Sequence, residues 1–167
     1  MVLKGKTWMF GDNISTDHII PGRFYHLRSD LDELTKHVFE DIAPGFYKKV
    51  NKGDIIVGGQ NFGLGSSREH APLIIKLAGI DAVVAKSFAR IFYRNAINVG
   101  LAAIICDIDG IEEGDSLELR VEEGVLSDHT KGLQKSFSPL SPMMRDILSE
   151  GGLVPYIKRY GELRVGE

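Results

Sequence analysis

The sequence predicts an α/β fold, with a mostly parallel β-α-β core and a small antiparallel β edge. Between residues 54 and 106, short continuous apolar runs alternate with stretches whose apolar residues recur every three or four positions. The runs are typical of buried parallel strands, and the recurring spacing is typical of helices. After residue 106, apolar and polar residues alternate instead, which indicates half-exposed strands. No repeat, low-complexity tract or linker interrupts the chain, so we expect one domain over residues 1–167.

The N-terminal part predicts one strand and one helix. Segment 6–10 (KTWMF) is typical of a strand, and the turn-rich segment 11–25 is expected to be irregular. A helix is predicted over 31–42, with Asp30 as its N-cap and the APG sequence at 43–45 as its end. The apolar stripe of this helix consists of Leu31, Leu34, Val38 and Ile42.

The central part predicts three buried strands joined by two helices. The strands are expected at 54–59, 81–87 and 101–106. The first helix is expected to run through Leu77, with Gly79 just past its end, and the second covers 88–99. The second helix carries its apolar face on Phe88, Ile91, Phe92 and Ala96. This order of elements favours parallel pairing with right-handed crossovers.

The last third predicts antiparallel strands and a closing helix. The expected elements are a strand around Leu117, Leu119 and Val121, a hairpin turn at 122–124 into 125–128, a strand at 134–138 and a helix opened by Ser141 and Pro142. The polar residues 159–167 are expected to fray.

Charge and cysteine content exclude several classes of protein. With 20 basic and 23 acidic residues, the chain lacks the basic excess expected of a nucleic-acid binder. No apolar run approaches the ~18 residues of a membrane span, and no signal peptide is found, so we expect a cytoplasmic protein. The only cysteine, Cys106, is expected to be a small core residue. Because an iron–sulfur cluster needs several thiolates, we expect no metal on this chain.

The segment 58–71, GGQNFGLGSSREHA, allows two interpretations. In the first, Ser66 and Glu69 form a capping box at the start of a helix. Pro72 would then fall inside that helix and remove a hydrogen bond, unless the helix is capped later, at Ser67 or His70.

The second interpretation of this segment is an anion site. Glycines at 63 and 65 let the backbone approach a ligand, and Arg68 offers a planar fork suited to a carboxylate. A nearby cation and amide donors can also stabilise the alkoxide of Ser66 and so make it a base. Because the lysine of a phosphate loop is missing, a small polycarboxylate is the expected ligand.

Three motifs together resemble the small subunits of the aconitase superfamily. They are STDHIIPGR at 15–23, GSSREHAP at 65–72 and FARIFYRNAINVGL at 88–101, in the order of the family. The resemblance covers almost the whole chain and is closest to the 3-isopropylmalate dehydratase family, with homoaconitase as its sister. It implies a swivelling α/β domain that docks on a large subunit carrying a [4Fe–4S] cluster. It also implies a hydro-lyase of leucine biosynthesis, which moves a hydroxyl between adjacent carbons and is active only with that partner.

The resemblance implies roles for individual residues. By motif position Ser66 is the base that removes the carbon-bound proton, while Ser67 and Arg68, with the backbone at Gly65, hold substrate carboxylates. One iron of the large subunit takes the departing hydroxyl as a Lewis acid. Asp17 is expected to pair with a histidine of the large subunit and tune protonation of the leaving hydroxyl, although taken alone it also suits a turn.

Three further residues are weighed beside these. For His18 a structural hydrogen bond is expected rather than a catalytic role. Arg28 lies where the family places its substrate-selecting loop and is the candidate for binding a substrate carboxylate, with Arg23 as its rival and a plain surface arginine as the alternative. An arginine there suits the third carboxylate of homocitrate, whereas isopropylmalate offers an apolar branch. Homoaconitase or dual activity therefore stays open.

Other functions and contacts are also open at this point. A stand-alone anion-binding regulatory module could use the same glycine-rich loop without chemistry, and the isolated chain could form a homo-oligomer. Nucleic-acid binding, which some aconitase relatives show, is disfavoured by the acidic charge. Arg90 and Arg94 lie four apart on one helix face and could make interface ion pairs, but a solvated face is the expectation. The leading expectation is an enzyme subunit for a small di- or tricarboxylate, with a large subunit as its partner.

Overall fold

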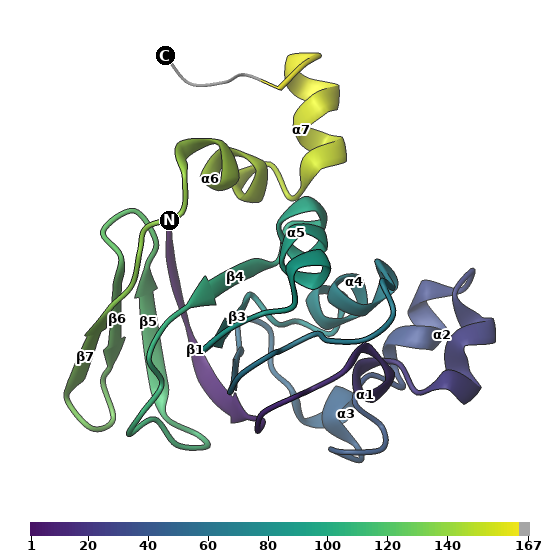
Figure 1. The fold of residues 1–167 in the computed structure, drawn as a ribbon, viewed down its shortest axis with the longest axis horizontal. Helices are drawn as coiled ribbons and strands as arrows, with labels where there is room; N and C mark the ends of the chain where they lie inside the picture. Colours follow the sequence, from purple (N-terminus) through teal and green to yellow (C-terminus); the bar gives the residue numbers. More distant parts are fainter. Residues whose placement is uncertain (164–167) are drawn as a thin grey trace.

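A single seven-stranded sheet organises the molecule. The computed structural model describes residues 1–163, and its strands follow the order β4-β3-β2-β1-β5-β6-β7 (Figure 1). The strands are β1 (Val2–Met9), β2 (Ile55–Gly58), β3 (Ala82–Ala85), β4 (Ala102–Ile105), β5 (Ser116–Arg120), β6 (Val125–Asp128) and β7 (Leu133–Ser136). β1 to β4 pair in parallel, and β5 to β7 continue the sheet in antiparallel pairing. The predicted fold class is therefore confirmed.

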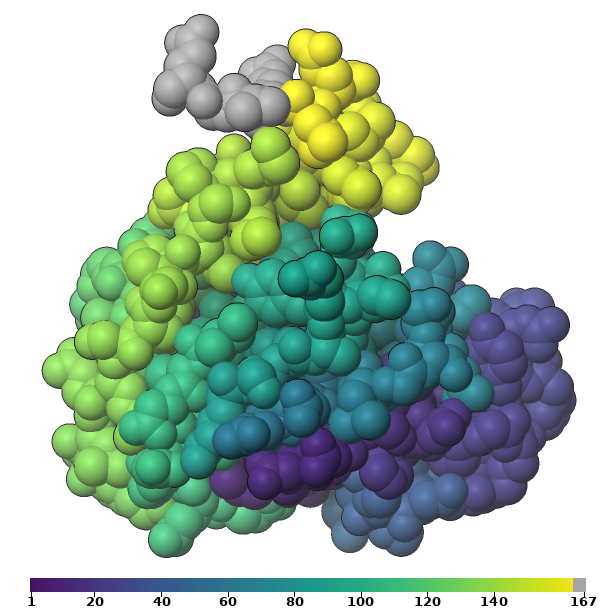
Figure 2. All heavy atoms as spheres, viewed as in Figure 1, coloured from purple at the N-terminus to yellow at the C-terminus, as the bar shows by residue number. Residues whose placement is uncertain are grey.

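Helices connect the parallel strands and cover them. The helical elements are α1 (Thr16–Ile19), the 3-10 helix η1 (Gly22–Leu27), α2 (Leu31–Thr35), α3 (Phe46–Lys49), α4 (His70–Leu77), α5 (Arg90–Val99), α6 (Pro142–Ser149) and α7 (Leu153–Tyr160). α4 joins β2 to β3, and α5 joins β3 to β4. The two helices pack against each other. Figure 2 shows α7 as a lobe that projects from the main body. None of the helices within residues 1–163 has the length and apolarity needed to cross a membrane.

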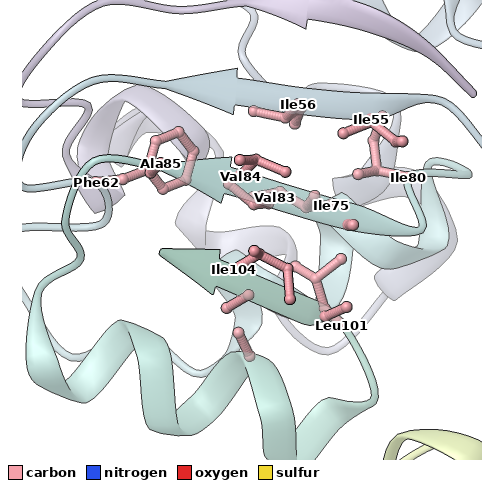
Figure 3. Packing of buried hydrophobic residues seen from close by; sticks show 14 of the residues in the cluster. Ile55, Ile56, Phe62, Ile75, Ile80, Val83, Val84, Ala85, Leu101 and Ile104 are labelled. Carbon is pink, nitrogen blue, oxygen red and sulfur yellow. The ribbon is translucent and has the colours of Figure 1, made fainter. Parts of the chain in front are cut away.

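The core lies between the parallel strands and these helices. β2 and β3 are buried along their whole length, which explains their continuous apolar sequences. Figure 3 shows apolar side chains of β2, β3 and β4 lying side by side, with Ile75 of α4 and Phe62 close to them. All of these side chains are buried. This layer holds the ends of β2 and β3, and so the loops that follow them, in fixed positions.

β1 joins the two halves of the sheet. It pairs in parallel with β2, Thr7 opposite Ile55, and in antiparallel with β5, Leu3 opposite Leu119. A Cβ at Gly5 would lie 2.0 Å from the carbonyl oxygen of Gly53, so only glycine allows this close approach. The strand begins four residues before the predicted one because the antiparallel partner β5 extends the pairing toward the N-terminus.

The helix predicted over 31–42 is shorter than expected. α2 ends at Thr35, and turns follow it. Phe39 has a positive φ of 56°, and its amide donates to the carbonyl of Ile19 at 3.1 Å instead of continuing the helix. The Phe39 ring stacks on Phe10 with 4.5 Å between ring centroids. Burial of this aromatic ring therefore overrides the helical periodicity, and Ile42 is left exposed.

Other elements differ from the predictions in smaller ways. Segment 11–25 is not irregular, because it holds α1 and most of η1. α3 and α7 were not predicted. α7 is held in place by its buried residue Tyr156, three residues before the segment that was expected to fray. The fraying expected for 159–167 is wrong for Arg159 and Tyr160, which belong to α7, and its last part, 164–167, lies outside the described residues. Ile91, placed by periodicity on the apolar face of α5, is 53% exposed.

Candidate functional site

Three loops meet at the carboxyl ends of the parallel strands. The loops that follow β1, β2 and β3 are joined by backbone hydrogen bonds, Asn13 to Gln60 at 2.8 Å and Phe62 to Ser87 at 3.0 Å. A short parallel bridge also links Ser15 to Leu64. This edge is where open parallel sheets place their ligands. The first loop carries the STDH motif and the second carries GSSREH, so the fold brings these distant motifs together.

The capping box expected at Ser66 and Glu69 does not form. α4 begins at His70, its N-cap is Glu69, and no side chain bonds its first amides. Pro72 is the third residue of α4, where an amide would have had no helical partner, so the proline costs nothing there. The hydroxyls of Ser66 and Ser67 are therefore not engaged in capping.

A cavity of about 300 Å³ lies beside this loop. Its lining residues are Thr16, Gly63, Gly65, Ser66, Ser67, Arg68, Ala89, Arg90, Ile91, Phe92 and Asn95. Ser66 and Ser67 are exposed at its edge. Four of the residues predicted for the site, Gly65 to Arg68, thus line one cavity, and α5 supplies the opposite wall.

Backbone geometry at the loop favours an anion. Gly65 has a φ of 102°, a conformation that side chains rarely adopt, and it turns the chain into the two serines. Among residues 1–163 no hydrogen bond occupies the amides of Ser66 and Ser67. Two free amides beside an arginine can bind a carboxylate or a serine alkoxide.

Arg68 and Asp17 form an ion pair. The Nη1 atom of Arg68 lies 2.7 Å from Oδ1 of Asp17 and donates to the carbonyl of Ile20 at 3.0 Å. The guanidinium also stacks on Tyr25, 4.7 Å from the ring centroid. The Arg68 side chain is 18% exposed, whereas that of Asp17 is 67% exposed. The structure therefore brings two predicted site residues into direct contact, with Asp17 on the outside.

A second hollow of about 490 Å³ adjoins the first and shares Ser67, Ile91 and Asn95 with it. Tyr25 lies in its wall. Arg28 donates to the carbonyl of Tyr25 at 3.3 Å, and its guanidinium lies 5.0 Å from the centroid of that ring. Arg28 lines neither hollow, so the structure does not bring it together with Gly65 to Arg68; it contacts the same aromatic ring as Arg68.

The rival arginine, Arg23, is occupied elsewhere. Its two terminal nitrogens donate to both carboxylate oxygens of Asp41, at 2.9 and 2.6 Å. The hydrogen bond to Asp41 raises the pKa of Arg23, and the reciprocal bond lowers the pKa of Asp41. Arg28, by contrast, has no carboxylate within ion-pair distance among residues 1–163.

His18 has the structural hydrogen bond expected for it. The amide of Ser15 donates to Nδ1 of His18 at 2.9 Å, and the amide of His18 donates to Oγ of Ser15 at 3.2 Å. This reciprocal capping box starts α1 and fixes the two residues that lie between Ser15 and His18, namely Thr16 and Asp17. His18 therefore shapes the loop that carries Asp17.

Sequence reasoning gave too little weight to the walls of the two hollows. Tyr25 and His70 line the second hollow, and Asn95 lines both. Arg90 and Arg94, expected on a solvated face, are exposed but also lie at the rims, and neither has an ion-pair partner in the described part of the chain. The spacing of Arg90, Arg94 and Asn95 on one helix was the available signal.

Within residues 1–163, no group of three or more histidine, cysteine or acidic side chains could hold a metal ion. Cys106 is buried, as expected for a core residue, and burial raises the pKa of its thiol. A buried neutral thiol is a poor metal ligand. The residues present therefore do not fit an iron–sulfur cluster.

Comparisons with known proteins find relatives that match this chain over almost its whole length. The aconitase C-terminal domain family matches residues 13–107. A 3-isopropylmalate dehydratase small subunit of Archaeoglobus fulgidus is 57% identical over 99% of this chain and 100% of its own length. A counterpart from Thermotoga maritima is 58% identical over 96% of this chain and 97% of its own. The crystal structure of a 3-isopropylmalate dehydratase chain from Methanocaldococcus jannaschii matches with a TM-score of 0.91 and 46% identity, covering 96% of each chain.

Proposed function

Because the chain belongs to the aconitase C-terminal domain family, and within it to the 3-isopropylmalate dehydratase small subunits, we propose that it is half of an isomerase that interconverts 2- and 3-isopropylmalate in leucine biosynthesis. The observation that carries this proposal is the single cavity lined by Gly65, Ser66, Ser67 and Arg68. Since its relatives are named small subunits, the chain works with a large subunit. We place the reaction in the cytoplasm and treat residues 1–167 as one swivelling domain.

Ser66 is the proposed base. As an alkoxide it takes the proton from the carbon beside a substrate carboxylate, and it becomes a neutral hydroxyl. Loss of that proton and of the hydroxyl on the neighbouring carbon removes one water and leaves a double bond. Addition of water in the opposite sense gives the isomer, with Ser66 returning the proton. The free amides of Ser66 and Ser67 and the nearby Arg68 favour the alkoxide by electrostatics.

Arg68 and Ser67 are the proposed carboxylate ligands. A guanidinium fork binds a carboxylate through two parallel hydrogen bonds, which fixes the angle of the substrate as well as its place. Tyr25 stacks against Arg68 and holds the plane of the guanidinium. Asp17, which now pairs with Arg68, is proposed to turn to a histidine of the large subunit when the subunits meet.

The large subunit is proposed to cover the face that bears both hollows. Ser66 and Ser67 are exposed in the isolated chain, and a reaction that develops negative charge needs water excluded. We assign the departing hydroxyl to the large subunit, together with the [4Fe–4S] cluster that the family uses as a Lewis acid. This chain contributes the base, the residues that bind the substrate carboxylates and part of the wall of the active site.

Reconstitution tests this function. The chain is added to a cluster-loaded large subunit encoded beside it, and absorbance of the unsaturated intermediate is followed with isopropylmalate. We expect turnover with the wild type and a loss of turnover of at least about 1000-fold with Ser66→Ala. Ser138→Ala, at an exposed serine after β7, should keep the wild-type turnover. Full activity of Ser66→Ala would contradict the assigned base. Carboxylate binding by the isolated chain, with no turnover in any complex, would favour an anion-binding module instead.

Homocitrate is a second candidate substrate because of Arg28. This arginine has no acidic partner among residues 1–163 and contacts Tyr25, which lines the second hollow, so we propose that it could turn to a third carboxylate there. Homocitrate is therefore assayed in parallel. Turnover of homocitrate would mean a homoaconitase or dual activity, whereas turnover of isopropylmalate alone would leave Arg28 a surface residue.

A further inference from the structure

The hydroxyl of Thr16 is a buried polar group that nothing satisfies. Thr16 is 2% exposed, and its Oγ1 has no hydrogen-bond partner among the described residues. Thr16 is the first residue of α1, so no preceding helical carbonyl is available to accept from it. Buried hydroxyls are seldom left unpaired in folded proteins, and such a group calls for a role.

The position of this hydroxyl is fixed by its surroundings. The Thr16 amide donates to the carbonyl of Leu64 at 2.8 Å, and its carbonyl accepts from Ile20 at 2.9 Å. The capping box at Ser15 holds the same turn. The backbone of Thr16 is therefore tied to the loop that precedes the two serines, which keeps its buried side chain beside that loop.

The same hydroxyl lies against the loop that carries the base. A Cβ at Gly65 would lie 3.2 Å from Oγ1 of Thr16, so the absence of a side chain at Gly65 is what lets the loop approach it. Thr16 and Ser66 line the same cavity. Ser66 follows Gly65 directly and is exposed, so its side chain and the Thr16 hydroxyl lie on neighbouring parts of this cavity.

We propose that Thr16 is a positioning residue, whose hydroxyl donates a hydrogen bond to the Ser66 alkoxide when the complex is assembled. A deprotonated serine has only lone pairs, so Thr16 must donate; after Ser66 takes the substrate proton, the threonine hydroxyl rotates and accepts. Thr16 keeps its own proton throughout. The inference rests on the proposed function and adds a third donor to the two amides at Ser66.

The test compares Thr16→Ser, Thr16→Ala and Thr16→Val in the assembled complex with isopropylmalate. Serine and alanine differ only by the hydroxyl, so this pair decides the matter even if the valine variant does not fold. We expect Thr16→Ala to lose about 10- to 100-fold in kcat with KM changed less than about twofold, and Thr16→Ser to stay within about threefold of wild type. The acidic limb of the kcat profile should move to higher pH in the alanine variant, because the alkoxide has lost a donor.

Three results would overturn the proposal. They are equal kcat in the serine and alanine variants, a loss confined to KM, and an unshifted pH profile in Thr16→Ala. Thermal unfolding and affinity for the large subunit are measured for each variant, and a loss of activity that follows a loss of affinity also counts against it. The Ser66→Ala complex is assayed in parallel. Full activity of Ser66→Ala would contradict the proposed function itself. An inactive Ser66→Ala together with an unaffected Thr16→Ala would contradict only the inference about Thr16.

Discussion

The guanidinium of Arg68 is held from three sides before any substrate arrives. Asp17, the carbonyl of Ile20 and the ring of Tyr25 all contact it. Because the guanidinium is already oriented, less side-chain conformational entropy is lost when a ligand binds to it. In the proposed function a substrate carboxylate would compete with Asp17 for the same guanidinium, so release of Asp17 and binding of substrate would be coupled.

Arg68→Lys tests this arrangement. Lysine keeps the charge but loses both the planar fork and the stacking on Tyr25. We expect KM to rise about 10- to 100-fold with a smaller change in kcat, measured by steady-state kinetics of the complex. Arg23→Lys is the matched control, because Arg23 is bound to Asp41 on the surface. An unchanged KM in Arg68→Lys would remove Arg68 from the substrate site.

Arg28→Val separates the two candidate substrates. Valine removes the charge and leaves an apolar side chain, which suits the branch of isopropylmalate. We expect kcat/KM for homocitrate, if the wild-type complex turns it over, to fall at least about 30-fold while the value for isopropylmalate changes less than about threefold. Arg23→Val provides the comparison. A parallel fall for both substrates would assign Arg28 a structural role through Tyr25.

At the scale of single elements, β5 contains a buried carboxylate with two cationic partners, Arg120 and Lys4, and a histidine beside it. Glu118 is 7% exposed, against the half-exposed strand expected there. Arg120 donates to it at 2.8 Å, His129 lies at 3.3 Å and Lys4 at 3.4 Å. The hydrogen bond from Arg120, followed by that from His129, lowers the pKa of Glu118 from 4.5 to about 2. This cluster ties β1 to β5 and to the residue after β6.

Glu118→Gln should change how stability depends on pH. The folded pKa of Glu118 lies below its unfolded value, so its contribution is complete above pH 4.5 and is lost as pH falls toward about 2. We therefore expect the variant to be less stable than wild type at pH 7, and the difference in free energy of unfolding to shrink between pH 4.5 and 2. Urea titrations at a series of pH values measure it. Glu162→Gln should give the wild-type curve, and a constant difference for Glu118→Gln would refute the assignment.

The sequence predicted strongly periodic or fully apolar elements and missed those that depend on distant contacts. β2, β3 and β4 were predictable because burial on both faces demands continuous apolar residues. The end of α2 was not, since it is set by Phe39 reaching Phe10 and the carbonyl of Ile19. The start of α4 was open in the sequence, and only the loop conformation decides that Glu69 is its cap.

For the site, the motifs located the serine loop and the STDH turn, but not how they meet. The ion pair between Arg68 and Asp17 depends on a bridge between Ser15 and Leu64, which periodicity cannot reveal. Tyr25 and Asn95 enter the hollows from other elements, and neither stands out in the sequence. The unpaired state of the Thr16 hydroxyl likewise exists only in three dimensions.

At the scale of the whole molecule, the face of α5 joins the site to the proposed interface. Ile91 is 53% exposed, lines both hollows and stands between Arg90 and Arg94. An exposed apolar residue flanked by arginines that have no ion-pair partner within 1–163 suits a partner surface that is apolar at its centre and acidic at its rim. The chain as a whole carries a net charge of −3, so the positive charge of Arg90 and Arg94 is opposite in sign to the net charge of the chain.

Ile91→Lys should weaken assembly with the large subunit. A lysine there buries a charge beside two like charges, and we expect the Kd of the complex to rise at least about tenfold, measured by titration of labelled subunits. Leu77→Lys is the matched control, because Leu77 is 48% exposed at the opposite end of α4. Thermal unfolding of both variants should stay near wild type. Equal affinities would place the interface on another face.

The central place of β1 has a consequence for how the protein is made. β1 is synthesised before both of its neighbours, β2 and β5, and each of them pairs along one of its edges. Until residue 120 has emerged, this strand has an open edge and partly covered apolar side chains. Pairing between such distant segments is slow, and an unpaired strand is a site where nascent chains associate wrongly. Newly made chains should therefore depend on a chaperone at the exit tunnel more than a protein with a terminal edge strand would.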